Sequence, residues 1–294
     1  MGAEAFAAAK VNLFLHVGAP GGDGYHPLCS LMVFADVGDE LELVEAPALT
    51  CRVRGPFAGA LVGEGDNLVL RAARAFAAHV GSAVIPVGFV LNKILPVAAG
   101  LGGGSSDAGA ALRLLAHVRG AGGLAGGLEG VAAGLGADGA ACLWGRPVLA
   151  EGRGERLSPA PILPAIDAVL VNPGVGVSTA EVYRRFDALA AFGDATPPVM
   201  PEAFESVEEL AGWLRSTRND LQSPAVALEP LIGDVLETLA DEPETLIARM
   251  SGSGATCFAL CAGDVEAEGL AERLEAMRPD WWVRRCRLGG PWKG

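Results

Sequence analysis

Pro96-Val97-Ala98-Ala99-Gly100-Leu101-Gly102-Gly103-Gly104-Ser105-Ser106-Asp107-Ala108 is the stretch that decides the fold. Four glycines in five positions leave the inner wall of a loop without side chains, so main-chain N–H groups can surround an anion. Helix-forming residues follow, and Ser105 and Ser106 are good N-cap types. A helix N-terminus behind such a loop is typical of a phosphate site. A purely structural turn is the alternative, because the chain contains 41 glycines.

Two familiar phosphate-binding loops are excluded. None of the three lysines follows a glycine, so the chain has no Walker loop. Ser105 stands where the dinucleotide fingerprint needs its third glycine, and the loop is far from the N-terminus, so a Rossmann site is disfavoured. The other glycine-dense stretch, Gly120–Gly127, lacks polar groups for a ligand and is predicted to be a linker.

Composition limits the class of protein. With 294 residues, 51% hydrophobic and 19% charged, the chain can bury one large core or two ordinary ones. No stretch approaches the ~20 apolar residues of a membrane span, and Glu4 and Phe6 argue against a signal peptide and a myristoylation site. Six scattered cysteines predict buried thiols in the cytoplasm. The net charge of −13 argues against nucleic acid as a partner, and the oligomeric state is not indicated.

Hydrophobic periodicity indicates an α+β protein with one division. Alternating or apolar runs predict strands over 10–17, 30–35, 39–44, 49–54, 87–93 and 168–172. An amphipathic helix is expected over 67–79, with Asp66 as its cap. The proline-bearing run Leu157–Pro164 is typical of a connection, so we expect an N-terminal nucleotide-binding domain over 1–158 and a C-terminal domain over 159–294.

Three further features each have two interpretations. Asp138 lies in an apolar, glycine-bounded segment, where a carboxylate is either a helix cap or a base; the local sequence favours the cap. Lys10 lies in an otherwise apolar strand, either as a solvated strand-end lysine, the simpler interpretation, or as a compact ammonium at a site. The Gly/Ser stretch within Met250–Leu260 is either a tight hairpin or a second main-chain cradle for phosphate.

Together these stretches resemble the ordered motifs of the GHMP small-molecule kinases. The motifs are Lys10-Val11-Asn12, Asp23-Gly24-Tyr25-His26, the phosphate loop Pro96–Ser106, Leu135-Gly136-Ala137-Asp138 and Ser251-Gly252-Ser253-Gly254-Ala255-Thr256. The likeness runs from about residue 8 to about residue 262. The Asp-Gly-Tyr-His element is similar to that of the members that phosphorylate a cytidine-diphosphate substrate in the non-mevalonate route to isoprenoid precursors.

The resemblance implies two α+β domains with the active site in the cleft between them, and ATP with Mg²⁺ as cofactors. The positions implied for the ATP phosphates are Pro96, Val97, Ala98, Ala99, Gly100, Leu101, Gly102, Gly103, Gly104, Ser105 and Ser106, with Asn67 and Lys93 near the nucleotide. Asp138 is implied as the general base toward a substrate 2-hydroxyl, which Lys10 orients. Tyr25, His26 and Tyr183 are implied for the cytosine, and Asn12 for the methylerythritol end. Ser105 and Ser106 are both open as Mg²⁺ ligands.

The chain departs from the family after the implied base. The family usually continues with Val-Pro and an aromatic residue, whereas Gly139-Ala140-Ala141-Cys142 follow here. The loss of a stiff proline bears on how firmly Asp138 is supported. Two alternatives stay open: another GHMP kinase, acting on homoserine or a mevalonate derivative, and a catalytically idle nucleotide-binding protein on the same scaffold.

Overall fold

The computed structural model describes residues 3–63, 65–82, 86–119 and 125–292. Their strands join in one mixed sheet, in the order β3-β4-β2-β10-β7-β9-β8, with β1 and β5 also paired to β2 and β6 paired to β5. The strands are β1 (Ala3–Val17), β2 (Leu28–Glu45), β3 (Thr50–Arg54), β4 (Val87–Asn92), β5 (Val148–Gly152), β6 (Arg156–Pro159), β7 (Ile166–Asn172), β8 (Thr245–Met250), β9 (Cys257–Cys261) and β10 (Trp282–Gly289). The expected α+β class is confirmed.

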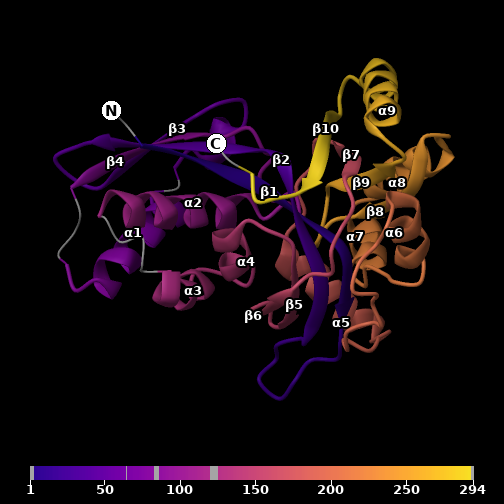
Figure 1. The fold of residues 1–294 in the computed structure, drawn as a ribbon, viewed down its shortest axis with the longest axis horizontal. Coiled ribbons are helices and arrows are strands. Elements are labelled where there is room, and N and C mark those ends of the chain that lie inside the picture. Colours follow the sequence, from indigo (N-terminus) through magenta and orange to yellow (C-terminus); the bar gives the residue numbers. More distant parts are fainter. Residues whose placement is uncertain (1–2, 64, 83–85, 120–124, 293–294) are drawn as a thin grey trace.

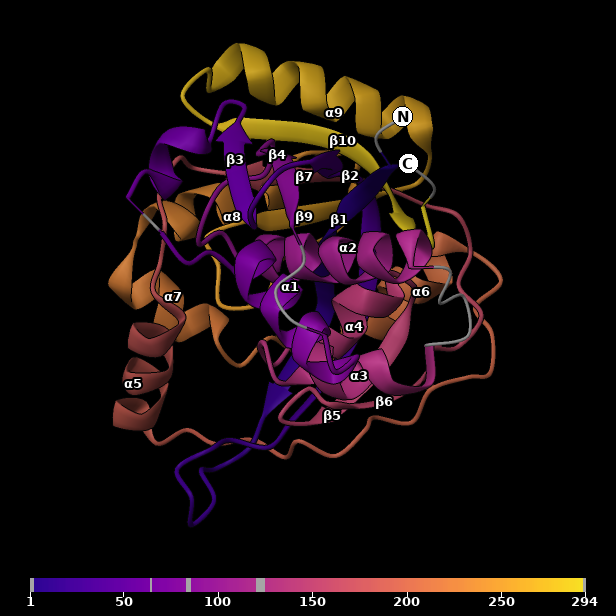
Figure 2. The same cartoon turned by 90° about the vertical axis from the view of Figure 1, so that its left-hand side faces the viewer.

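Helices cover this sheet in two groups (Figure 1). They are the 3-10 helix η1 (Ala58–Leu61) and the α-helices α1 (Leu68–His79), α2 (Gly103–Val118), α3 (Ala125–Ala133), α4 (Gly139–Trp144), α5 (Thr179–Leu189), α6 (Val207–Leu214), α7 (Gln222–Leu228), α8 (Leu231–Asp241) and α9 (Asp264–Met277). α1, α2 and α3 share one apolar core with β3 and β4. α5, α7, α8 and α9 share another with β7, β8 and β9. Figure 2 is turned so that α1, α2 and α3 face the viewer, with α9 above them and α5 and α7 to their left.

The strand that joins the two groups is β2, which is 18 residues long and pairs with β1, β4, β5 and β10. The prediction of two separate strands here was wrong, because the chain runs through Asp36–Gly38 without a break. Gly38 is not a turn residue. A Cβ at Gly38 would collide with the main-chain carbonyl of Ala7, so glycine lets β1 and β2 approach closely at this point.

Several local predictions can now be compared with the structure. α1 begins at Leu68 and its cap is Asn67, whose side chain accepts a hydrogen bond from the N–H of Leu70; the prediction of Asp66 as the cap was wrong by one residue. Asp66 instead pairs with Arg74. Of the predicted linker Gly120–Gly127, residues 120–124 lie outside the described part, and the rest begins α3, so that part of the prediction was wrong.

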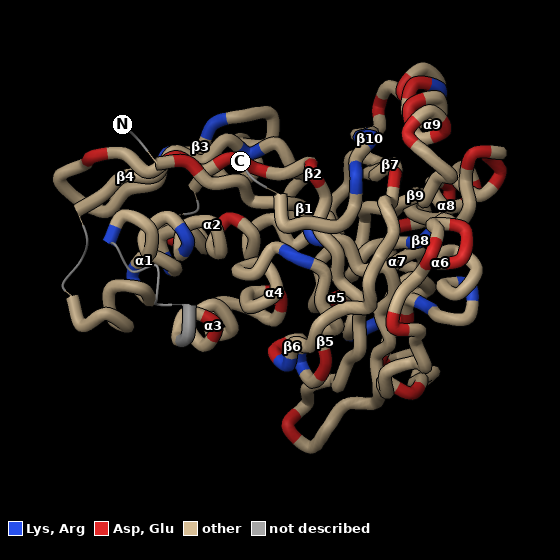
Figure 3. The backbone as a smooth tube through the Cα atoms, viewed as in Figure 1, with Lys and Arg blue, Asp and Glu red and all other residues tan. Residues whose placement is uncertain are grey.

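The remaining expectations concern the connections and the cysteines. The predicted connection Leu157–Pro164 was wrong for its first three residues, which belong to β6, and the rest leads on to β7. The division between 158 and 159, which stays a prediction, falls inside β6. The six cysteines are free thiols, and all but Cys51 are buried. No helix in the described ranges is long and apolar enough to span a bilayer. Figure 3 shows Lys and Arg dispersed among the acidic residues of both helix groups.

Candidate active site

A pocket of about 460 Å³ lies where the phosphate loop meets β1, α5 and the β8–β9 loop. The predicted residues that line it are Lys10, Asn12, Asn67, Lys93, Pro96, Val97, Ala98, Ala99, Gly100, Gly102, Gly103, Gly104, Ser105, Asp138 and Tyr183. Four other predicted residues, Leu101, Ser106, Tyr25 and His26, do not line it. The fold therefore brings most of the predicted site to one place.

The carbonyl groups of the phosphate loop are held by the rest of the protein. Five consecutive carbonyls accept hydrogen bonds, those of Ala98, Ala99, Gly100, Leu101 and Gly102. Their donors, in the same order, are the N–H of Val177, the N–H of Thr256, the hydroxyl of Ser251, the N–H of Lys10 and the N–H of Ser106. Distances run from 2.8 to 3.3 Å. The loop is thus fixed through its acceptors.

Most main-chain N–H groups of the same loop have no hydrogen-bond partners among the described residues. From Gly100 to Ser105, no main-chain N–H has an acceptor in the part of the chain that the structure describes. The last three of these groups belong to the first turn of α2, where a helix leaves its N–H groups unpaired. Carbonyls that are already hydrogen-bonded, together with unpaired N–H groups along a pocket, are the features that a main-chain anion site requires.

Helix α2 starts earlier than predicted, and neither serine caps it. It begins at Gly103, and its N-cap is Gly102 in a left-handed conformation with φ +63°. The hydroxyl of Ser106 is buried and donates to the carbonyl of Ala8 at 2.7 Å, whereas Ser105 lines the pocket. Glycine succeeds as the cap residue here because φ is positive and because Lys10 Cε would lie 3.1 Å from an added Cβ.

Lys10 and Asp138 form an ion pair at one side of the pocket. Lys10 Nζ lies 3.2 Å from Asp138 Oδ2 and 2.5 Å from Asn12 Oδ1. The lysine side chain is 4% exposed, so its interpretation as a solvated strand-end residue was wrong. Asp138 occupies the N-cap position of α4, but its side chain makes no capping hydrogen bond. Its carboxylate is 29% exposed and faces the lysine, so the locally favoured cap interpretation was also wrong.

The segment after Asp138 has a structural reason for its unusual sequence. Gly139, Ala140, Ala141 and Cys142 are buried in α4. A Cβ at Gly139 would collide with the main-chain carbonyl of Ala132 at the end of α3. Glycine therefore lets α3 pack directly behind the residue that follows Asp138. Close helix packing stands in the place where the family pattern has a proline.

Lys93 lies at the other side of the phosphate loop in a buried cluster. Its Nζ is 2.5 Å from Asp39 Oδ2 and 2.8 Å from Asp107 Oδ2. Asp39 also accepts from the N–H groups of Ile94 and Leu95. Burial raises the pKa of the Asp107 carboxyl to about 7, although the Lys93 ammonium opposes the shift. Burial would lower the pKa of Lys93, but the two carboxylates outweigh it and raise the value.

The residues predicted for cytosine lie on the loop between β1 and β2 and on α5. The loop between β1 and β2 projects away from the body in Figures 1 and 2. On it, Tyr25 is 59% exposed, and the guanidinium of Arg153 lies 3.9 Å from its ring centre. The His26 ring lies 5.2 Å from that of Tyr183. Its Nδ1 is 2.8 Å from the Gly18 carbonyl and its Nε2 is 3.1 Å from Asp187.

Tyr183 is the member of this group that lines the main pocket. Burial, with a smaller contribution from the Asp138 carboxylate, raises the pKa of its phenol to about 12. The hydroxyl therefore stays protonated at neutral pH and can donate a hydrogen bond. The structure thus brings His26 and Tyr183 together and leaves Tyr25 on an exposed arm beside them.

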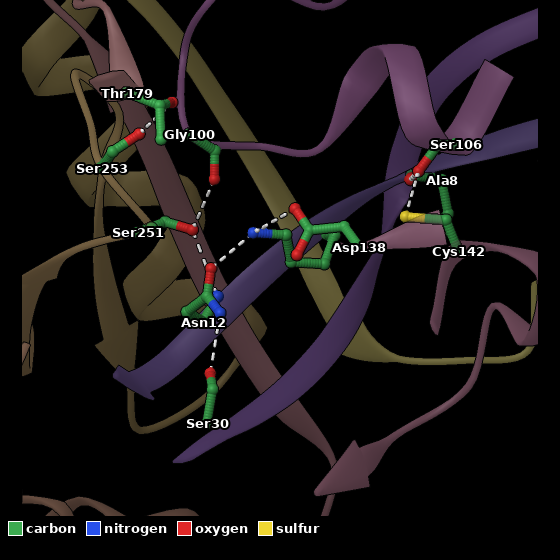
Figure 4. Close-up of polar contacts among 12 residues, drawn as sticks. Ala8, Asn12, Ser30, Gly100, Ser106, Asp138, Cys142, Thr179, Ser251 and Ser253 are labelled. Atoms are coloured by element: carbon green, nitrogen blue, oxygen red, sulfur yellow. Dashed lines mark hydrogen bonds and ion pairs between the residues drawn. The ribbon is translucent and has the colours of Figure 1, made fainter. Parts of the chain in front are cut away.

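The β8–β9 loop was predicted to be either a tight hairpin or a main-chain cradle for phosphate, and it has features of both. β8 and β9 pair antiparallel, so the loop closes a hairpin. Its Gly252 and Ser253 also line the pocket, and Ser251 bonds the phosphate loop through the Gly100 carbonyl. The close-up in Figure 4 shows this contact beside Asn12 and Asp138. Whether the loop itself contacts phosphate stays a prediction.

Sequence reasoning missed four polar residues of this region. Asp39 and Asp107 hold Lys93, Arg153 covers Tyr25, and Ser30 bonds the Asn12 amide. The position of Asp107, directly after Ser106 in the deciding stretch, was a signal that could have found it. Asp39 and Ser30 depend on pairing between distant strands, for which the sequence carries no local signal.

The fold and the site define a class of protein. The N-terminal domain model of the GHMP kinases matches residues 67–146, and the model of their C-terminal domain matches residues 199–280. A homoserine kinase structure from Cytophaga hutchinsonii has the same fold, with a TM-score of 0.70 at 19% identity over 98% of this chain and 95% of its own. The chain belongs to the GHMP kinases, and it is a small-molecule kinase.

Proteins similar to this chain over nearly its whole length carry the name 4-diphosphocytidyl-2-C-methyl-D-erythritol kinase. The protein of that name from Caulobacter sp. (strain K31) is 63% identical over 98% of this chain and 99% of its own length. The one from Hyphomonas neptunium is 48% identical, over 97% of this chain and 96% of its own. A crystal structure of 4-(cytidine 5'-diphospho)-2C-methyl-D-erythritol kinase matches with a TM-score of 0.75 and 34% identity, covering 98% of this chain and all of that one.

Proposed function

We propose that the chain is a cytoplasmic, ATP-dependent kinase that phosphorylates the 2-hydroxyl of 4-diphosphocytidyl-2-C-methyl-D-erythritol. One observation carries the chemistry: a row of unpaired main-chain N–H groups and the Lys10–Asp138 pair line the same pocket. The relatives' shared name supports the substrate. The exposed ring of Tyr25 supplies a stacking face and the Tyr183 hydroxyl a hydrogen-bond group of the kinds that a cytosine needs, while the His26 ring, held by Gly18 and Asp187, lies against Tyr183.

Phosphoryl transfer needs positioning and charge stabilisation more than covalent chemistry. The N–H groups of Gly100 and of Gly102 to Ser105 bind the phosphates of ATP, because they line the pocket and have no other partner in the described residues. Asp138 takes the proton of the substrate hydroxyl, since its carboxylate is the part of the ion pair that is open to the pocket. Lys10, held by Asn12 and Asp138, orients that hydroxyl and balances the charge that develops on its oxygen.

The residues present fit a magnesium ion bound mainly by ATP. Mg²⁺ prefers oxygen ligands and commonly keeps one or two protein ligands beside substrate phosphates. Ser105 offers a hydroxyl that lines the pocket, whereas the Ser106 hydroxyl is committed to Ala8. No group of three or more metal-ligating side chains occurs in the described ranges. Ser105 would hold the ion beside the phosphates of ATP, and the ion would neutralise phosphate charge when bound.

The direct test offers Mg·ATP and three acceptors in parallel: the cytidyl substrate, homoserine and phosphomevalonate. We expect ADP release with the cytidyl substrate alone. Turnover only with homoserine or phosphomevalonate would retain the kinase and replace the substrate. Binding of ATP without turnover of any acceptor would favour the idle scaffold.

The cytosine subsite has its own test in Tyr25→Ala, with Tyr25→Phe as the matched control. Stacking of a base on an aromatic ring contributes roughly 1–3 kcal/mol. We expect Tyr25→Ala to raise KM for the cytidyl substrate by about 5- to 100-fold and to leave KM for ATP within about 2-fold. The phenylalanine variant keeps the ring and should stay close to wild type. Equal losses for both ligands in the alanine variant would place Tyr25 outside the subsite.

A further inference from the structure

A chain of three hydrogen bonds leads from the interior of the sheet to the Lys10 ammonium. Figure 4 shows the bond between Ser30 and Asn12 in this chain. The hydroxyl of Ser30, a fully buried residue of β2, donates to the main-chain carbonyl of Phe14 at 2.6 Å. The Asn12 side-chain amide donates from Nδ2 to the same hydroxyl at 2.7 Å. Lys10 Nζ donates to Asn12 Oδ1 at 2.5 Å.

The direction of this chain is fixed at its inner end. A main-chain carbonyl only accepts hydrogen bonds, so the single proton of the Ser30 hydroxyl points at Phe14. The hydroxyl oxygen must then accept from Asn12, which turns the NH₂ of the amide toward Ser30. The carbonyl oxygen of the amide is left facing Lys10. A buried serine therefore decides which end of the Asn12 amide the ammonium meets.

Strand geometry delivers these groups to one face. Lys10 and Asn12 are two residues apart on β1, so their side chains share a side of the strand. Register shifts in the pairing with β2 flank this pair, one between Ala8 and Lys10 and one between Asn12 and Phe14. Such bulges re-aim side chains beside sites. The N–H of Asn12 also donates to Ser251 Oγ at 3.1 Å, which ties the residue to the β8–β9 loop.

We propose that Ser30 is a positioning residue of the phosphoryl transfer, acting through Asn12 on Lys10. This inference rests on the proposed roles of Lys10 and Asp138. Without the Ser30 hydroxyl the Asn12 Nδ2 group loses its acceptor, so the amide is no longer held in place and its oxygen withdraws from the ammonium. Lys10 loses an acceptor and shifts toward Asp138, away from the position that orients the substrate hydroxyl.

The first experiment compares Ser30→Val with Ser30→Thr. Both add the same bulk at a fully buried position, and only threonine keeps the hydroxyl. We expect Ser30→Val to lower kcat by about 10- to 100-fold, because misplacement of a reacting group by about 1 Å has effects of that size. KM for ATP should stay within about 2-fold. Threonine should restore kcat to within about 3-fold of wild type. Equal kcat values for the two variants would overturn the proposal.

A double-mutant cycle asks whether the effect passes through Asn12. Asn12→Leu removes the amide, so Ser30→Val should cause no further loss of kcat in that background. An undiminished loss there would show that Ser30 acts by another route and would overturn the proposal.

A measurement without substrate separates this inference from the proposed function. In protein labelled with [¹⁵N]asparagine, the Asn12 NH₂ signals are identified by their absence in Asn12→Leu. We expect slow hydrogen exchange of these signals in wild type and Ser30→Thr, and fast exchange in Ser30→Val. Equal exchange in all three would overturn the orienting role, whatever the substrate. Failure of the wild type to turn over the cytidyl substrate would instead refute the proposed function, with the exchange result still deciding whether Ser30 orients the amide.

Discussion

Two lysine–carboxylate groups lie on opposite sides of the same glycine loop, and they differ in what surrounds them. Lys10 pairs with Asp138, whose side chain is 29% exposed. Lys93 pairs with Asp39 and Asp107, neither of which is more than 5% exposed. An added Cβ would lie 3.1 Å from Lys10 at Gly102 and 3.0 Å from Lys93 at Gly103. Neighbouring glycines thus let the loop lie against one open and one sealed ion pair.

The comparison teaches that burial, rather than residue type, separates the partly exposed carboxylate of Asp138 from the buried carboxylates of Asp39 and Asp107. An exposed carboxylate can meet a substrate hydroxyl and exchange a proton. A sealed cluster instead ties the end of β4 to the first turns of α2, because Asp39 bonds Ile94 and Leu95 and Asp107 belongs to α2. The sealed group carries two carboxylates for one cation, and burial has raised the pKa of one of them, Asp107.

The largest expected effect is on the open pair. Asp138→Asn keeps the shape and removes the base, so kcat should fall by about 10²- to 10⁴-fold. The affinity for Mg·ATP, measured by calorimetry, should stay within about 3-fold, because the loop N–H groups are untouched. A variant with the full rate would show that the carboxylate has no part in proton transfer.

Removal of the cation from the sealed cluster should lower the stability of the fold. Lys93→Met leaves two buried carboxylates without their cation, which costs about 3–5 kcal/mol of unfolding free energy. Lys10→Met is the matched control: it should abolish turnover and cost about 1–2 kcal/mol, since Asp138 keeps contact with solvent. Urea unfolding measures both. Equal destabilisation by the two substitutions would contradict the distinction between an open and a sealed pair.

The smallest expected effect is on the pH dependence of the unfolding free energy, and it concerns the sealed cluster alone. Because the Asp107 pKa is raised from 3.8 to about 7, the folded protein binds more protons than the unfolded chain between those values. Stability from this group is therefore full below about pH 4 and is lost as pH rises through 7. Asp107→Asn removes this dependence. It should unfold with a free energy higher than wild type by on the order of 2 kcal/mol at pH 8, with a smaller gap at pH 5.

Thermal or urea unfolding at the two pH values checks this prediction. Asp66→Asn is the control, because Asp66 is an exposed residue paired with Arg74. It should leave the pH dependence unchanged. A gap for Asp107→Asn that does not widen from pH 5 to pH 8 would show that Asp107 is ionised throughout.

The sequence was sufficient for features that depend on neighbouring residues. The phosphate loop, the α+β class and the pocket positions of Lys10 and Asp138 followed from short motifs and their resemblance to a family. The caps were missed by one to four residues. Asp66 and Asn67 are both good N-cap types, so residue type alone does not separate them. Gly102 is the N-cap of α2 because φ is positive at this position, a conformation that favours glycine over serine.

The register in which distant strands pair could not be predicted from the sequence. Ser30 meets Asn12 only because β1 pairs with β2 in the register that places Asn12 opposite Met32, two residues from Ser30. Asp39 reaches Lys93 across 54 residues of chain through the pairing of β2 with β4. A shift of one residue turns every side chain of a strand to its other face, so such contacts have no signature in local sequence. The continuous strand β2 was missed for the same reason, since Gly38 serves a close approach and no turn.

The phosphate loop takes its shape from the far half of the protein. Val177, Ser251 and Thr256 lie in the C-terminal part of the chain, yet they hold the carbonyls of Ala98, Gly100 and Ala99. A chimaera that receives the glycine loop of another kinase must therefore receive the matching segments around 177 and 251–256. Residues 1–158 expressed alone would contain the whole glycine loop but would lack Val177, Ser251 and Thr256, the donors that hold its carbonyls in place.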